Sequence, residues 1–422
     1  MDIVSYGEFS QTFHRRTMQR HLPLSGAIEV TRRCPLTCVH CYNNLPMADR
    51  DAARSELTLE EHCRILDELA DAGCLWLLFT GGEIFARRDF LDIYTHAKKR
   101  GFLITLFTNG TLITPRIADY LVTWKPFAIE ITLYGATKET YDRLTGVPGS
   151  YEKCLRGIHL LMERKLPLAL KTVAVTVNVH ELQAMQEFAD RLGVPFKYDG
   201  MMNPRVDCSQ SPLAVRLTPE DCVALDLDDD KRVGEWREIA QLFAGPANPP
   251  EHADEVYHCG GGVNSFAIDP QGGLSLCVLS QRDKFSLRTG SVQDGWHGAL
   301  RQVRARKTRM VTKCTACELK SSLCGMCPAN GELENGDAES PVDFLCRVAH
   351  LRAYALDIPV PPHGPCEYCE GGEGYGEMMS TLARLRARPR DRPRRQAKLL
   401  PVVGAAAQGG CGSGGCSSCS AR

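Results

Sequence analysis

Three cysteines near the N-terminus, Cys34, Cys38 and Cys41, lie in the segment Cys-Pro-Leu-Thr-Cys-Val-His-Cys, called here the cysteine loop (residues 34–41). Three thiolates on one loop can bind three irons of a cubic [4Fe–4S] cluster, whose usual ligand set is four cysteines. One iron would then stay open to a substrate. The same spacing also suits three ligands of a zinc site, with His40 as the candidate for the fourth, or unpaired thiols in a reducing compartment.

A second group of cysteines lies in the C-terminal half of the chain, at positions 259, 277, 314, 317, 324, 327 and 346. In a chain long enough to fold without disulfides, such clustering is more typical of metal sites than of scattered core positions. A zinc ribbon built from four of them is the alternative. Four isolated cysteines are expected to be buried small hydrophobic residues, namely Cys63, Cys74, Cys154 and Cys222.

The composition narrows the class of protein. The 422 residues are 43% hydrophobic, carry a net charge of −1 and include 20 cysteines. This balance gives no reason to expect binding to nucleic acid or to an acidic membrane. Apolar runs of about 18 residues, which a transmembrane helix needs, do not occur in the sequence. Residues 1–11 lack the apolar core of a secretory signal, so we expect a cytoplasmic protein.

Short apolar runs alternate with amphipathic helical stretches in the first half of the chain. The strand candidates are residues 27–31, 75–80, 103–108, 128–133, 168–175 and 196–198, and the helix candidates include 58–72, 89–99, 116–122 and 151–165. This alternation implies parallel βαβ units. Six such units predict an α/β fold with a partial (β/α)6 TIM-like barrel, followed by a C-terminal cysteine-rich domain.

Unusual loops follow the first four predicted strands. They are the cysteine loop and residues 81–83, 108–110 and 134–135. In a barrel of this kind the active site lies at the carboxyl ends of the strands. The four loops are therefore expected to converge on one mouth.

The cysteine loop, with His40 before its last cysteine and Tyr42 after it, resembles the signature of the radical S-adenosylmethionine (SAM) superfamily. Gly81-Gly82-Glu83 matches the second motif of that family, and the resemblance covers residues 27–198. It implies that the three loop cysteines bind a [4Fe–4S] cluster whose open iron chelates SAM. It also implies that the glycines let the backbone approach the methionine part, that Glu83 accepts a hydrogen bond from the SAM ammonium group, and that SAM is reductively cleaved to a 5′-deoxyadenosyl radical.

The same resemblance suggests further contacts with SAM. Asn109 and Thr132 occupy positions where the family contacts the methionine and ribose parts. Arg143 either pairs with the SAM carboxylate or is a surface cation. His40 is expected to pack near the adenine rather than bind metal, and Tyr42 is an adenine neighbour or a core residue.

The seven C-terminal cysteines resemble the SPASM extension of radical SAM peptide-modifying enzymes, which typically carries two auxiliary [4Fe–4S] clusters. The resemblance assigns four of them to an outer cluster, here the outer cysteines: Cys314, Cys317, Cys324 and Cys346. Three, the inner cysteines, are assigned to an inner cluster: Cys259, Cys277 and Cys327. The last two spacings are six and two residues where the family has five and three. The fourth inner ligand is left open among Cys208, Cys366, Cys369, a non-cysteine group and none.

The sequence predicts five regions: a lead-in over residues 1–26, the core barrel over 27–200, a bridging region over 201–258, the auxiliary-cluster domain over 259–360 and a flexible tail over 361–422. Residues 384–398 are a basic run, and Cys411, Cys416 and Cys419 lie in a Gly/Ser-rich end. Cys366 and Cys369 complete a cluster, form a redox pair or are plain thiols.

The expected function is radical modification of a peptide or protein side chain, as a thioether, another cross-link or an oxidation. Val278 follows Cys277, where sulfatase-maturing relatives carry an aspartate base, which argues against that activity. A flavodoxin or ferredoxin is the expected electron donor, and any leader-peptide-binding protein would be separate. The alternatives are maturation of a small cofactor or tetrapyrrole, and a non-catalytic iron–sulfur or zinc-binding interaction module.

Overall fold

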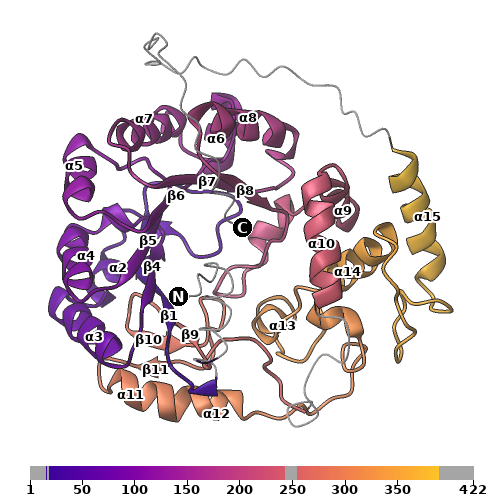
Figure 1. Cartoon of the computed structure of the whole chain (residues 1–422). Helices are drawn as coiled ribbons and strands as arrows, with labels where there is room; N and C mark the ends of the chain where they lie inside the picture. The colour runs from indigo at the N-terminus through magenta and orange to yellow at the C-terminus, as the bar shows by residue number, and fades with distance from the viewer. Residues whose placement is uncertain (1–15, 17–18, 243–253, 389–422) are drawn as a thin grey trace, which may run out of the picture.

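The computed structural model of the chain describes residue 16 and residues 19–242 and 254–388 (Figure 1). The expectations for residues 1–11, for most of the basic run and for the three tail cysteines lie outside these residues. In the described part, none of the helices combines the length and the apolar character needed to cross a membrane.

Six parallel strands form the centre of the fold. They are hydrogen-bonded in the order β1 (Ser25–Thr31), β4 (Trp76–Gly81), β5 (Leu103–Thr108), β6 (Ala128–Thr132), β7 (Leu168–Val173) and β8 (Phe196–Asp199). Figure 1 shows the strands curving around a central space with helices on the outside. The predicted partial barrel is confirmed, and the strand ends differ from the predicted ones by at most two residues.

Helices cover the outer face of this sheet: α2 (Arg50–Ser55), α3 (Leu59–Asp71), α4 (Phe90–Lys99), α5 (Pro115–Thr123), α6 (Lys138–Thr145), α7 (Ser150–Glu163) and α8 (Leu182–Leu192). Thr58 begins α3 with a reciprocal capping box to Glu61. Along β5, Ile104 and Leu106 are fully buried, while the alternate residues Leu103, Thr105 and Phe107 are partly exposed. Because side chains alternate along a strand, one set packs under the helices and the other faces the barrel interior.

The cysteine-rich region begins as a continuation of the barrel sheet. β9 (Ser265–Ile268) pairs parallel with β1, and β10 (Gly273–Ser275) and β11 (Phe285–Ser286) follow antiparallel. A short helical segment comes next, with α11 (Val292–Asp294), a π-helical turn (Gly295–Ala299) and α12 (Leu300–Arg304). The sequence did not predict these strands, because runs of two to four residues are too short for a periodic pattern.

Five helices form the C-terminal side of the molecule: α9 (Pro219–Leu227), α10 (Asp230–Leu242), α13 (Pro328–Asn335), α14 (Asp343–Ala355) and α15 (Tyr375–Ala387). Single turns of 3-10 helix occur at Ile84–Ala86, Val179–Glu181, Ser211–Val215 and Glu318–Ser321. The structure differs from the predicted flexible tail over residues 361–388, which it folds against α14. Met378 and Leu382, one turn apart on α15, are buried there. The sequence analysis did not predict this helix because the surrounding residues are rich in Gly and Pro.

Candidate active site

The cysteine loop leaves the carboxyl end of β1 and lies between two short paired strands, β2 (Arg33–Cys34) and β3 (Leu45–Pro46). Cys34 and Cys38 are buried and Cys41 is half-buried. All three pack into one apolar cluster with Leu36 and Met202, and each is a free thiol. The structure thus brings together the three thiols that the sequence singled out.

Polar groups orient these thiols. The Cys34 Sγ accepts hydrogen bonds from the backbone N–H of Leu36 at 3.4 Å and from Asn109 Nδ2 at 3.5 Å. Tyr134 hydrogen-bonds to Cys38. Burial, with the nearby Glu83, raises the pKa of Cys34 to about 12. A bound cationic metal centre would therefore be needed to hold this sulfur as a thiolate.

Gly81 and Gly82 lie where the end of β4 meets the start of the cysteine loop. The backbone N–H of Gly82 donates to the carbonyl of Thr31 at 2.8 Å. A Cβ at Gly81 would lie 2.0 Å from that same carbonyl oxygen, and one at Gly82 would lie 2.4 Å from the carbonyl oxygen of Arg32. These glycines are thus needed for the two motifs to dock, a reason separate from the predicted approach to SAM.

Glu83 joins the second and third loops of the barrel mouth. Its carboxylate accepts hydrogen bonds from Thr108 Oγ1 at 2.7 Å, from the backbone N–H of Asn109 at 2.8 Å and from that of Phe85 at 3.2 Å. Burial raises the pKa of Glu83 to about 7. Glu83 therefore holds Asn109 in place, and Asn109 in turn contacts the Cys34 sulfur. A contact of Glu83 with SAM stays a prediction.

His40 packs edge-on against the ring of Tyr134, with ring centroids 5.2 Å apart. Burial lowers the pKa of His40 to about 4, so the imidazole is neutral near pH 7. His40 therefore packs beside Tyr134, and its expected place near the adenine stays a prediction. Tyr134 follows the fourth barrel strand, whose loop was expected to reach the mouth.

Glu29 is a functional candidate that the sequence analysis missed. This buried carboxylate on β1 accepts hydrogen bonds from Asn43 Nδ2 at 2.5 Å, from Tyr42 Oη at 3.3 Å and from Arg32 Nη2 at 2.9 Å. It therefore ties the residues after the cysteine loop to the barrel interior. An acidic residue inside an otherwise apolar strand was the signal that could have revealed it.

The bridging region covers the far side of the cysteine loop. Arg205 donates from Nη1 to Asn44 Oδ1 at 2.9 Å and from Nη2 to the carbonyl of Asn44 at 3.0 Å. The backbone N–H of Val206 donates to the carbonyl of Tyr42 at 2.9 Å. These contacts hold the segment after Cys41 from outside the barrel.

A cavity of about 540 Å³ opens at the carboxyl ends of β6, β7 and β8. Thr132, Lys171 and Asp199 line its barrel side, and Trp236 of α10 and Arg352 of α14 close the opposite side. Burial lowers the pKa of Lys171 to about 7, although Glu130 opposes that shift. The cavity thus combines apolar walls with ionisable groups, as binding pockets for organic substrates do.

Arg143 lies apart from this cavity, on the exposed surface of α6. Its guanidinium donates to the carbonyl of Val177 at 3.1 Å. This position agrees with a surface cation, and a contact with the SAM carboxylate stays a prediction.

The outer cysteines line one small cavity in the C-terminal region, together with His350 and His363. Cys366 hydrogen-bonds with one of them, Cys346. Cys366 therefore lies beside the outer cysteines, and a role of Cys366 or Cys369 as the missing inner ligand stays a prediction.

The inner cysteines form a separate group. Cys259 and Cys277 each lie close enough to Cys327 to help raise the pKa of its thiol, which burial brings to about 11. The buried carboxyl of Glu332 on α13 acts on Cys277 in the same way. Cys208 instead contacts the carbonyl of Glu332, at 4.0 Å from its sulfur. The carboxyl of Glu332 thus lies close enough to the inner cysteines to act on one of them.

Comparison with known proteins identifies the family. The radical SAM superfamily matches residues 28–192, a span that runs from within β1 to beyond β7 and holds both predicted motifs. The chain belongs to the radical SAM superfamily. Because this superfamily binds a [4Fe–4S] cluster and SAM, the buried and convergent thiols of the cysteine loop are the fitting ligands. The protein is therefore an enzyme of this superfamily, with a cysteine-rich region of the SPASM type at its C-terminal side.

Two relatives and one solved structure extend the comparison. The chain is 34% identical over 167 residues to an AdoMet-dependent heme synthase of Methanosarcina barkeri, covering 40% of this chain and 47% of the relative. It is 29% identical over 344 residues to a PqqA peptide cyclase of Rhodopseudomonas palustris, covering 78% and 88%. The structure of Streptococcus suis SuiB bound to the precursor peptide SuiA is similar in fold, with a TM-score of 0.59 and 17% identity over 78% of this chain and 79% of SuiB. This radical SAM chain thus spans about half of the heme synthase and most of the peptide cyclase.

Proposed function

We propose that this radical SAM enzyme modifies a side chain of a peptide or protein. The observation that carries the proposal is the similarity to a PqqA peptide cyclase, which extends over 344 residues and so includes the C-terminal cysteine region as well as the barrel. A relative that shares only the barrel would share SAM cleavage alone. The substrate of that cyclase is a peptide by its name, and we carry this substrate class over to the present chain.

The cysteine loop holds the cluster in this proposal, through Cys34, Cys38 and Cys41. When bound, the cluster and SAM would supply the radical chemistry needed to remove a hydrogen atom from the substrate. The chain itself keeps the thiols in position through Asn109 and Tyr134. The SAM contacts proposed are those of the sequence motifs: His40, Tyr42, Gly81, Gly82, Glu83, Asn109, Thr132 and Arg143.

The cavity beside β6 to β8 is the proposed place of the substrate side chain. It adjoins Thr132, a proposed SAM contact, so a hydrogen atom in it would lie near the radical. Its closed wall is built by Asp226 of α9, which pairs with Arg232 of α10 at 2.6 Å and with Arg352 of α14 at 2.8 Å. Such a wall excludes water from a reactive intermediate.

The two groups of C-terminal cysteines are the proposed ligands of two auxiliary [4Fe–4S] clusters. The outer cysteines supply a full set of four thiols. For the inner cysteines we propose Glu332 as the non-cysteine fourth ligand, because its buried carboxyl acts on Cys277. Auxiliary clusters suit an oxidative reaction, since the product radical must pass on an electron. A flavodoxin or ferredoxin donor and a separate leader-peptide-binding protein belong to the same proposal.

A second candidate is maturation of a tetrapyrrole. The similarity to the AdoMet-dependent heme synthase favours it, with the higher identity over the barrel. The cavity, which is lined by the amines of Lys171 and Lys197, also suits a substrate with carboxylates.

Transfer of deuterium separates the two candidates. The anaerobically purified enzyme is incubated with SAM, a strong reductant and either perdeuterated short peptides encoded beside its gene or an iron porphyrin with deuterated propionates. The proposal expects deuterium in 5′-deoxyadenosine and a peptide lighter by two hydrogen atoms. If deuterium reaches 5′-deoxyadenosine only from the porphyrin, peptide modification is refuted and tetrapyrrole maturation is supported.

A further inference from the structure

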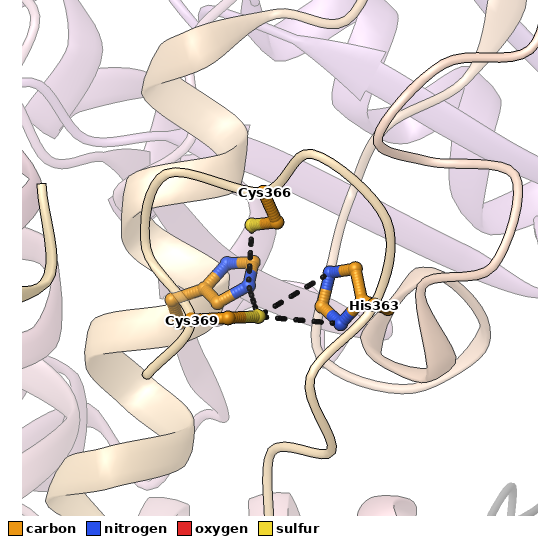
Figure 2. A group of neighbouring side chains, drawn as sticks. His363, Cys366 and Cys369 are labelled. Atoms are coloured by element: carbon orange, nitrogen blue, oxygen red, sulfur yellow. Dashed lines mark hydrogen bonds between the residues drawn. The ribbon is translucent and has the colours of Figure 1, made fainter. Parts of the chain in front are cut away.

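Two histidines and two cysteines converge beside the outer cysteines. His350 lies on α14, and His363, Cys366 and Cys369 lie in the segment between α14 and α15 (Figure 2). Their ligand atoms all lie within 4.8 Å of one another, and all four residues are buried. We propose that these residues form a mononuclear zinc site, separate from the iron–sulfur clusters.

The imidazole of His350 is held in the tautomer that a metal ligand requires. Its Nδ1 lies 2.8 Å from the carbonyl oxygen of Cys346 one turn earlier on α14, and since a carbonyl can only accept, Nδ1 carries the hydrogen. The lone pair is then on Nε2, which lies 3.3 Å from Cys366 Sγ and 3.9 Å from Cys369 Sγ. A backbone carbonyl on the second nitrogen is the usual support of a metal-binding histidine.

His363 is supported in the same way. Its Nδ1 lies 2.8 Å from the carbonyl oxygen of Pro361 and 3.4 Å from Cys369 Sγ, and its Nε2, which then carries the lone pair, lies 3.8 Å from the same sulfur. Both rings thus have an unprotonated Nε2 within 4 Å of Cys369 Sγ. In Figure 2 the labelled side chains point toward one common centre.

The spacing of the ligand atoms is that of a single tetrahedral ion. With Zn–S of about 2.3 Å and Zn–N of about 2.0 Å, neighbouring ligand atoms of a tetrahedron lie about 3.5 Å apart. The N···S separations within the group, from 3.3 to 3.9 Å, surround that value. Two thiolates and two neutral imidazoles also balance the charge of a divalent ion, which favours a buried site. Among the residues that the structure describes, this group alone brings three or more such ligand atoms so close together.

The site is distinct from the outer cluster in its ligands. The outer cysteines already make a set of four, so the cluster needs neither Cys366 nor Cys369. A Cys2His2 set is closed, as in zinc sites that stabilise a fold. Bound zinc would fasten the segment before α15 to α14, whose Cys346 is an outer cysteine. The proposal holds whether the substrate is a peptide or a tetrapyrrole.

X-ray absorption at the zinc edge tests the site in the full-length enzyme, because iron–sulfur clusters do not contribute there. The anaerobically purified protein should contain about one zinc per chain, surrounded by two sulfurs at about 2.3 Å and two nitrogens at about 2.0 Å. A zinc content near zero after growth in zinc-supplied medium, or a shell of four sulfurs or of oxygens, would overturn the proposal.

Substitutions show which side chains bind the zinc ion. His363→Ala and Cys369→Ser should lose zinc while iron and sulfide stay at the wild-type amount, and Cys369→His should keep zinc with one sulfur and three nitrogens. Cys63→Ser, on a half-buried cysteine of α3, is the matched control and should keep both metals. A loss of iron with zinc retained would place these residues in the outer cluster instead. If the Ala and Ser variants do not fold, the wild-type spectrum decides alone.

Discussion

Asn109 Nδ2 lies 3.5 Å from Cys34 Sγ and donates a hydrogen bond to it, so a residue of the third barrel loop supports a ligand of the first. The same Asn109 receives its position from Glu83 of the second loop, through the backbone hydrogen bond of 2.8 Å. Three loops that are far apart in the sequence are thereby joined at the proposed cluster site. Outer contacts of this kind commonly tune a metal centre.

Asn109→Ala should weaken SAM cleavage without unfolding the barrel. The loss of the donor to Cys34 removes support from one cluster ligand, and we expect cleavage to fall about 10–100-fold. Initial rates of 5′-deoxyadenosine formation measure the effect, with electron paramagnetic resonance reporting a shifted cluster signal. Asn335→Ala, on α13, is the control. Unchanged rates and spectra in Asn109→Ala would mean that this contact is irrelevant to the cluster.

Gly82→Ala should displace the cysteine loop, because its Cβ would lie 2.4 Å from the carbonyl oxygen of Arg32. The clash costs about 1–3 kcal/mol or more and should lower both cluster content and SAM cleavage. Gly234→Ala is the matched control, since no atom lies within 4 Å of its added Cβ. Iron analysis and thermal unfolding give the comparison, and equal behaviour of the two variants would refute the docking role of Gly82.

The buried Glu83 predicts a pH dependence of stability. Its pKa is about 7 in the folded chain, above the ordinary value of 4.5. Between these values the folded state holds a proton that the unfolded state releases, so the free energy of unfolding falls as the pH rises from about 4.5 to 7. Glu83→Gln should remove up to about 3 kcal/mol of that fall. Denaturant unfolding of both proteins across this range measures it, and parallel curves would disprove the assignment.

The ion pair between Arg352 and Asp226 should be needed for the cavity wall. Both side chains are buried, and the Nε–Oδ2 distance is 2.8 Å. Arg352→Ala leaves a buried carboxylate with Arg232 alone and should cost about 3–5 kcal/mol. Arg386→Ala, which removes an exposed pair with Asp357, should cost under about 1 kcal/mol. Similar melting temperatures for the two variants would contradict this role.

Much of the barrel could be predicted from the sequence, because each strand is an apolar run long enough to stand out between amphipathic helices. The cysteine loop could be located at the carboxyl end of the first strand for the same reason. The sequence did not reveal that Gly82 is needed for contact with the backbone of Arg32, since that contact depends on the register of β4 against β1.

Other features required the folded chain. Glu29 lies in an apolar strand, and only the tertiary structure shows the side chains that it holds. The Cys366 and Cys369 pair was visible in the sequence, but its neighbours were not, because His350 approaches from a helix 16 residues earlier than Cys366. Tertiary contacts of that kind leave no periodic pattern for a sequence to display.

The central claim is that Cys34, Cys38 and Cys41 hold the cluster that cleaves SAM. Its most direct test is 5′-deoxyadenosine formation by the anaerobically purified protein with SAM and a strong reductant, compared with a variant in which all three cysteines are alanine. We predict multiple turnovers by the wild type, and in the variant a loss of about four irons per chain and no 5′-deoxyadenosine. Continued formation of 5′-deoxyadenosine by the variant would contradict the account.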